Sequence, residues 1–251
     1  MINDHVWQEI SKKYLNSKPF EHVVIDNFLN EEIASEVSSE FPSWESPDWT
    51  YTYKNPVEDK KLCSHWDKFK TTTYKLLWYF NSDSFVIPLQ VLTKNPNIQL
   101  DIGMHGGGYH GHNNGGILSK HLDYDIHPKL GMQRKLNMII YLTKNWEDSW
   151  GGGLGLWSGD DKTASKLEKN VAVKFNRAII FDTTQNSWHG LVEPVTCPSN
   201  VIRKSLAVYY VHPAPKNSSD RKRARFLPTD DQKDNNDVIK FCRDREIYYG
   251  Y

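Results

Sequence analysis

The chain has 251 residues, and its 31 Lys and Arg residues balance its 31 Asp and Glu residues. This length fits one domain of catalytic size, and the lack of a basic excess argues against a nucleic-acid partner. No run of about 18 apolar residues is present, so no membrane partner is expected. Residues 1–16 lack the apolar segment of a signal peptide, and the three cysteines are scattered. We therefore expect a single-domain protein, 1–251, in the reducing cytoplasm.

The N-terminal region, residues 1–98, is predicted to be mostly helical and to support the rest of the domain. Apolar residues recur there at helical spacing, and Asn30 is a suitable N-cap for the acidic first turn that follows it. Residues 22–29 favour a short strand, and residues 43–63 are expected to be irregular. The predicted helices are 4–16, 31–41 and 65–81.

The pattern changes after residue 98 to short segments rich in β-branched and aromatic residues, separated by turn-forming residues. Such spacing predicts a sandwich, jelly roll or barrel for residues 99–212. Residues 160–170 are expected to be a charged surface connection, and residues 213–251 a polar C-terminal extension on the outside. The predicted strands are 99–105, 135–143, 154–157, 170–175, 178–183 and 205–211.

His121 and Asp123 are the first candidates for a metal site. Residues two apart on a strand point to the same face, so an imidazole and a carboxylate would converge there. Asp125 is the rival carboxylate. His189 follows a predicted strand and offers a second imidazole. Two histidines and one carboxylate without cysteine suit a non-haem Fe(II) site with open positions.

Arg203 and Ser205 open the last predicted strand. A guanidinium binds a carboxylate through two parallel hydrogen bonds. Ser205, two residues further on, would add a hydroxyl on the same face. This pair therefore predicts a binding site for a carboxylate.

Together these segments resemble the prolyl 4-hydroxylase-like branch of the Fe(II)/2-oxoglutarate-dependent oxygenases, over residues 99–212. Residues 19–33 also resemble the N-terminal segment of this branch, whereas residues 34–98 and 213–251 carry none of the motifs of this resemblance. The motifs that carry the resemblance are HLD (121–123), YLTKNW (141–146), GGGLGLW (151–157), NRAIIF (176–181), SWHG (187–190) and RKSLAVYY (203–210).

The resemblance implies a mainly β fold with flanking helices, in which the N-terminal helices pack on one sheet of a double-stranded β-helix (jelly-roll) core. It implies that His121, Asp123 and His189 hold Fe(II), and that O2 and 2-oxoglutarate are consumed, with ascorbate as a candidate reductant. The residues expected at the distal carboxylate of 2-oxoglutarate or along its pocket are Arg203, Ser205, Tyr141 and Asn137.

The implied activity is hydroxylation of an unactivated C–H bond in peptidyl proline, another amino acid or a small polar molecule, with succinate and CO2 as co-products. Related halogenases lack the carboxylate that Asp123 provides, so hydroxylation is favoured over halogenation. Collagen-type prolyl 4-hydroxylases tend to have lysine in place of Arg203, which argues against a collagen-like substrate. The alternatives are an inactive jelly-roll module that binds carbohydrate or peptide, which the 32 aromatic residues would suit, and a zinc hydrolase.

Residues 106–111 fit the pattern G-x-G-x-x-G, but no helical periodicity follows them, so a dinucleotide site is not expected. A flexible loop at the edge of the site is the better interpretation. Tyr109, His110 and His112 are then candidates for substrate contact, with ordinary surface positions in the loop as the favoured interpretation. Trp157 is a candidate for an aromatic wall, with core packing as the favoured interpretation.

Overall fold

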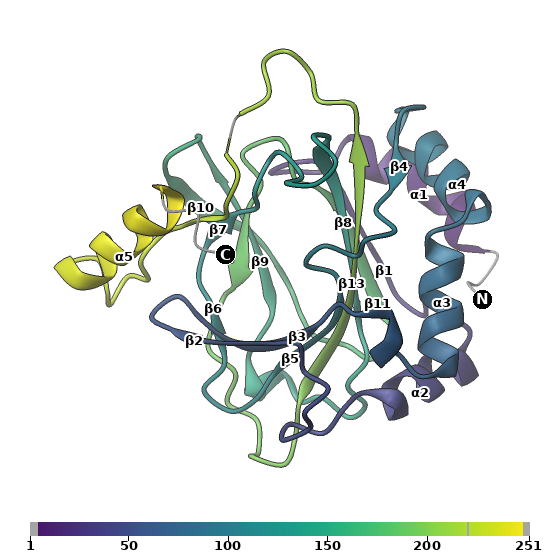
Figure 1. Cartoon of the computed structure of the whole chain (residues 1–251), viewed down its shortest axis with the longest axis horizontal. Helices are drawn as coiled ribbons and strands as arrows, with labels where there is room; N and C mark the ends of the chain where they lie inside the picture. Colours follow the sequence, from purple (N-terminus) through teal and green to yellow (C-terminus); the bar gives the residue numbers. More distant parts are fainter. Residues whose placement is uncertain (1–4, 220, 248–251) are drawn as a thin grey trace.

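Two antiparallel sheets face each other in the computed structural model, which describes residues 5–219 and 221–247 (Figure 1). Among these residues, the larger sheet has the strand order β1-β11-β8-β13-β5-β3-β2, with β4 paired to β13 and β6 to β3. The smaller sheet has the order β10-β9-β12-β7-β14. This arrangement is the jelly-roll core that the sequence predicts.

The larger sheet contains β1 (His22–Ile25), β2 (Tyr51–Asn55), β3 (Glu58–Cys63), β4 (Gln99–Leu100), β5 (Gly108–His112), β6 (Ile117–Leu118), β8 (Gln133–Tyr141), β11 (Arg177–Asp182) and β13 (Arg203–His212). The smaller sheet contains β7 (His121–Leu122), β9 (Leu154–Gly159), β10 (Ala164–Val171), β12 (Trp188–Leu191) and β14 (Arg225–Phe226). The helices are α1 (His5–Leu15), α2 (Glu31–Glu40), α3 (Thr71–Phe80), α4 (Asp83–Thr93) and α5 (Asn236–Ile247), with 3-10 turns η1 (Trp66–Lys68) and η2 (Asp148–Trp150).

Helices α1 to α4 lie together on the outer side of the larger sheet, and α5 lies on the opposite side of the molecule (Figure 1). The side chains of β8 and β13 point alternately toward the helices and toward the space between the sheets, because successive side chains of a strand point to opposite faces. One set packs against the helices in the main hydrophobic core, for example Met138 and Val208. The other set, which includes Asn137 and Ser205, faces the space between the sheets. None of the helices in the described part of the chain combines the length and apolarity of a membrane span.

The N-terminal region contains strands as well as helices. The strand expected within residues 22–29 is present as β1, which pairs with β11 at the sheet edge. The expectation that residues 43–63 are irregular is wrong, because β2 and β3 form a hairpin and β3 pairs with β5. Four of the six β3 residues are charged, so pairing with a neighbouring strand, and not local propensity, determines this element.

Three other expectations also need correction. Residues 160–170 are not only a connection, since β10 begins at Ala164. Of residues 99–105, only Gln99 and Leu100 form a strand. The C-terminal extension is more than a tail on the outside: β14 pairs with β7 and brings Phe226 beside the candidate site. Its apolar side chains pack with Val57 in a small separate cluster.

Candidate active site

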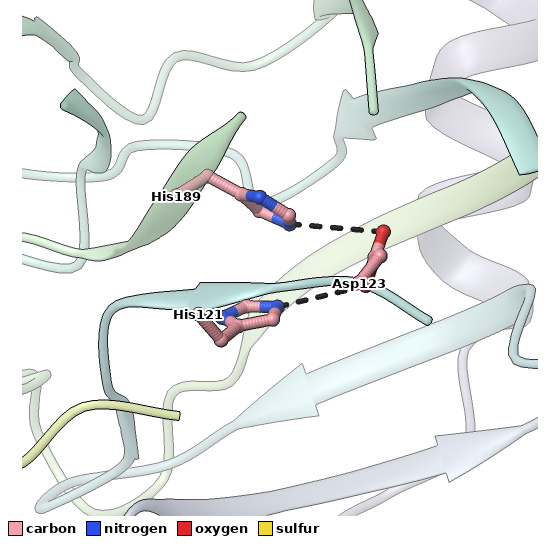
Figure 2. A group of neighbouring side chains, drawn as sticks. All are labelled: His121, Asp123 and His189. Atoms are coloured by element: carbon pink, nitrogen blue, oxygen red, sulfur yellow. Dashed lines mark ion pairs between the residues drawn. The ribbon is translucent and has the colours of Figure 1, made fainter. Parts of the chain in front are cut away.

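The two histidines of the predicted metal site lie on adjacent strands of the smaller sheet. His121 on β7 and His189 on β12 are directly opposite in the antiparallel register. Their ring centroids are 4.2 Å apart. Asp123 follows β7, and one ligand atom of each of these three residues lies within 4.8 Å of the other two. Figure 2 shows both imidazoles pointing toward the carboxylate.

The hydrogen bonds of the imidazoles leave the same nitrogen of each ring available. Nδ1 of His121 is 2.9 Å from the carbonyl oxygen of Ser119, and Nδ1 of His189 is 2.8 Å from that of Ser187. A carbonyl oxygen only accepts, so each Nδ1 carries the proton and each Nε2 presents a lone pair. This is the backbone support that metal-binding histidines usually have.

The protonation states favour binding of a cation. Burial lowers the pKa of His121 to about 3, with a further contribution from the neighbouring His189, and burial also lowers the pKa of His189. Burial by itself raises the pKa of Asp123, but the charge of Arg134 and the two imidazoles outweigh it and hold that pKa at about 2. Two neutral imidazoles and one carboxylate therefore face one another at neutral pH.

The cluster fits a divalent metal ion better than a hydrogen-bonded group. The Nε2 atoms of His121 and His189 are 3.7 and 3.9 Å from the carboxylate oxygens of Asp123, which is too long for hydrogen bonds. Oδ2 of Asp123 is buried and has no hydrogen-bond partner among the described residues. Asp125, the rival carboxylate, is hydrogen bonded to Gln133 at 2.8 Å and lies outside the cluster.

A second group of polar residues lies on the larger sheet, on the face that points toward the smaller sheet. Arg203 is 3% exposed, and its Nε donates to the carbonyl oxygen of Gly152 at 2.7 Å. Its guanidinium carbon is 4.9 Å from the ring centroid of Tyr141. Tyr141 in turn is directly opposite Ser205 across β8 and β13. Burial lowers the pKa of Arg203, and no acidic side chain in residues 5–219 or 221–247 forms an ion pair with it.

Residues 107–212 match the sequence profile of the 2OG-Fe(II) oxygenase superfamily. This segment is similar to the 2OG-Fe(II) oxygenase superfamily. The matched range contains the His-Asp-His cluster and Arg203. No curated protein matches the chain significantly.

Solved structures of oxygenases share the fold of this chain. A prolyl hydroxylase from Trichoplax adhaerens, in complex with a hypoxia inducible factor peptide fragment, has a TM-score of 0.53 and 16% identity, over 83% of this chain and 90% of that chain. A prolyl 4-hydroxylase structure from Phytophthora capsici has a TM-score of 0.55 and 19% identity, over 97% of this chain and 72% of that chain. HygX from Streptomyces hygroscopicus, with nickel, 2-oxoglutarate and hygromycin B bound, has a TM-score of 0.51 and 12% identity, over 81% and 87%.

A cavity of about 760 Å³ opens onto the three clustered residues. His110, Asn137 and Ser205 are among the residues that line it. The lining includes Ser205 but not Arg203, which lies two residues earlier on β13. Arg203 is therefore next to the lining of this cavity and not part of it.

Two of the candidate substrate contacts point elsewhere. Tyr109 packs in the core beneath the helices, and its hydroxyl donates to Thr73 at 2.6 Å, so the expectation that it contacts substrate is wrong. Trp157 packs with Leu122 and Trp188 and forms no wall of the cavity, as the favoured interpretation held. The flexible loop expected at residues 106–111 is also a misassignment from residue 108 onward, because β5 begins there.

Arg134 is a site residue that the sequence analysis missed. Its guanidinium lies between the rings of Tyr124 and Tyr209, 3.6 and 3.5 Å from their centroids. Nη1 is 3.6 Å from Oδ2 of Asp123. Simple alternation from Asn137 would place Arg134 on the helix side. An irregularity between β8 and β13 at Tyr210 shifts the register and turns it toward the cavity.

Proposed function

We propose that this oxygenase hydroxylates an unactivated C–H bond, with His121, Asp123 and His189 as the ligands of Fe(II). The observation that carries this proposal is the buried Asp123 carboxylate: the Nε2 atoms of both histidines face it, and its Oδ2 atom has no hydrogen-bond partner among the described residues. Two imidazoles and one carboxylate leave open positions on the ion. When bound, the iron with O2 and 2-oxoglutarate supplies the oxidising power that inserts one oxygen atom into the C–H bond, and succinate and CO2 are the co-products.

Arg203 is proposed to bind the distal carboxylate of 2-oxoglutarate. A buried guanidinium without an acidic partner is costly, and a dicarboxylate would compensate it. Ser205 and Tyr141 are opposite one another beside it and can add hydroxyl donors. Asn137 lines the same cavity, and its buried Oδ1 has no hydrogen-bond partner among the described residues. These residues would fix the cosubstrate so that its keto acid end faces the metal ligands.

The substrate is proposed to be a polar small molecule, a free amino acid or a residue of a peptide, peptidyl proline included. The charged side chains around the cavity support a polar substrate, because both signs occur there. The charged residues of the cavity are Glu58, Lys60, Asp123, Arg134, Lys222, Arg223, Asp244 and Arg245. His110 lines the same cavity directly opposite Ser205 and is the candidate for direct substrate contact.

A cytoplasmic location and ascorbate as the reductant complete the proposal. Cys63, Cys197 and Cys242 are all buried free thiols, which is the usual state of cysteine in a reducing compartment. Ascorbate dependence is tested by measuring how many turnovers the protein sustains with and without it.

Metal and cosubstrate binding are tested together under anaerobic conditions. Protein with Fe(II) and 2-oxoglutarate should develop the weak visible charge-transfer absorption of an iron–keto acid chelate, and His121→Ala should abolish it. Asp123→Asn and Asp125→Asn are a matched pair: the first should lose the absorption, and the second should keep it. Succinate release, screened across amino acids and peptides, then identifies the substrate. A protein that shows neither absorption nor succinate release would instead be an inactive binding module.

A further inference from the structure

His112 is a buried histidine whose two ring nitrogens have no hydrogen-bond partner among the described residues. Its side chain is 2% exposed. Buried polar atoms in proteins are nearly always hydrogen bonded, so an imidazole without any partner needs an explanation. The other histidines of the site, His110, His121 and His189, each use a ring nitrogen to contact a backbone carbonyl oxygen.

The position of His112 places it beside Arg203. Strand β5 runs between β13 and β3 in the larger sheet (Figure 1), and His112 is directly opposite Arg203 in the β5–β13 register. The next pair on the same face is His110 opposite Ser205. Side chains of directly opposite residues have Cβ atoms about 4.5–5.5 Å apart. The imidazole and the guanidinium are therefore neighbours at the end of the sheet where β5 ends and β13 begins.

The positive charge beside His112 is not balanced by a negative one. Burial first, and then the positive charges of Arg203 and Lys60, lower the pKa of His112 well below its usual range, so the ring is neutral and offers one N–H donor. Arg203 contributes a positive charge without an acidic partner in the described residues. Two donors side by side are the complement of a carboxylate, which has about four acceptor sites.

We propose that the imidazole N–H of His112 donates a hydrogen bond to the distal carboxylate of 2-oxoglutarate, beside Arg203. This inference rests on the proposed function. The guanidinium can occupy two acceptor sites of the carboxylate, and His112 binds at one of those that remain. His112 is thus a specificity residue that helps the site select a keto acid with a second carboxylate.

The test compares the dissociation constants of two keto acids in the Fe(II) protein without O2, measured by calorimetry and by the charge-transfer absorption. 2-Oxoglutarate has the distal carboxylate, and 2-oxopentanoate has a methyl group at that end. His112→Leu keeps the bulk and removes the donor. We expect it to weaken 2-oxoglutarate binding about 10-fold or more, the usual cost of losing a hydrogen bond to a charged group. Binding of 2-oxopentanoate should stay within about 2-fold, since that ligand makes no such bond.

His112→Asn is the second variant, because its amide retains an N–H donor and should keep part of the preference for 2-oxoglutarate. The ratio of the two dissociation constants is measured on one preparation, so a partly unfolded sample does not alter it. If His112→Leu leaves this ratio unchanged, the assignment is overturned while the proposed function stands. If the wild-type protein binds neither keto acid, both are overturned.

Discussion

The ring of Phe226 stacks on the imidazole of His121, with centroids 4.9 Å apart and planes 17° from parallel. The two residues are opposite each other across β14 and β7. The C-terminal extension therefore packs directly on a proposed metal ligand. Removing the ring by Phe226→Ala should leave His121 less well oriented and weaken Mn(II) binding about 10–100-fold, as for other residues that support ligands.

Val238→Ala is the matched control for this change, because Val238 belongs to the same apolar cluster as Phe226. It should reduce the free energy of unfolding and leave Mn(II) affinity nearly unchanged, as measured by electron paramagnetic resonance. Equal losses of affinity in both variants would show that Phe226 acts only through stability.

Gly152 controls the position of Arg203. It has a φ of +70°, and a Cβ atom there would lie 2.9 Å from Cδ of Arg203. Gly152→Ala should push the guanidinium away from its place and raise the dissociation constant of 2-oxoglutarate about 10-fold or more, while metal affinity changes little. Gly131→Ala is the control, since Gly131 has a φ of +64° with no neighbour within 4 Å of the added atom. Gly131→Ala should introduce the same kind of backbone strain as Gly152→Ala, but it should bind 2-oxoglutarate as the wild type does.

Tyr109→Phe tests the assignment of Tyr109 to the core. The change removes the buried hydrogen bond to Thr73 and should lower the free energy of unfolding by about 1 kcal/mol. Calorimetric titration should give a wild-type dissociation constant for 2-oxoglutarate. A clear weakening of cosubstrate binding would show that Tyr109 contributes to the binding site.

The metal-free protein should become less stable as the pH is lowered. The pKa values of His112, His121 and His189 are lowered in the folded state, that of His121 to about 3. Below the ordinary value of 6.5 the unfolded chain binds protons that the folded chain does not, so stability is lost as the pH falls from 6.5 toward 3. Each such histidine contributes about 1.4 kcal/mol per pH unit in this window. Urea unfolding at pH 7.5, 6 and 5 measures the slope.

His112→Leu should make this slope shallower by the share of one histidine, because that variant has one proton-binding group fewer in the unfolded chain. An identical slope in both proteins would mean that His112 already takes up its proton in the folded state.

The local pattern of the sequence was sufficient to bring His121 and Asp123 together. His121 and Asp123 lie two residues apart, and their side chains converge as strand geometry requires. The same rule separates Tyr109 from His110, because adjacent residues of β5 point to opposite faces. It could be applied only if residues 108–112 were recognised as a strand. Their glycines made a loop the more natural prediction.

Other parts of the site depend on long-range pairing, which the local pattern does not contain. Arg134 faces Asp123 because the register between β8 and β13 shifts nearby. Phe226 reaches His121 because a two-residue strand pairs with β7 across more than a hundred residues of chain. Lys60 lines the cavity on a strand whose charged sequence favours no strand by itself. Each of these placements follows from which strands pair, and not from the residues at the position.

The direct pairing of His121 with His189 has a consequence for metal choice. Backbone hydrogen bonds between β7 and β12 hold the two imidazoles in place, so an incoming ion finds them already arranged. A site of two imidazoles and one carboxylate is expected to follow the usual order of first-row divalent ions, whose intrinsic affinities rise from manganese to copper. Zinc and copper would therefore compete with iron for the protein, and occupancy by the active metal would depend on which ions the surroundings supply.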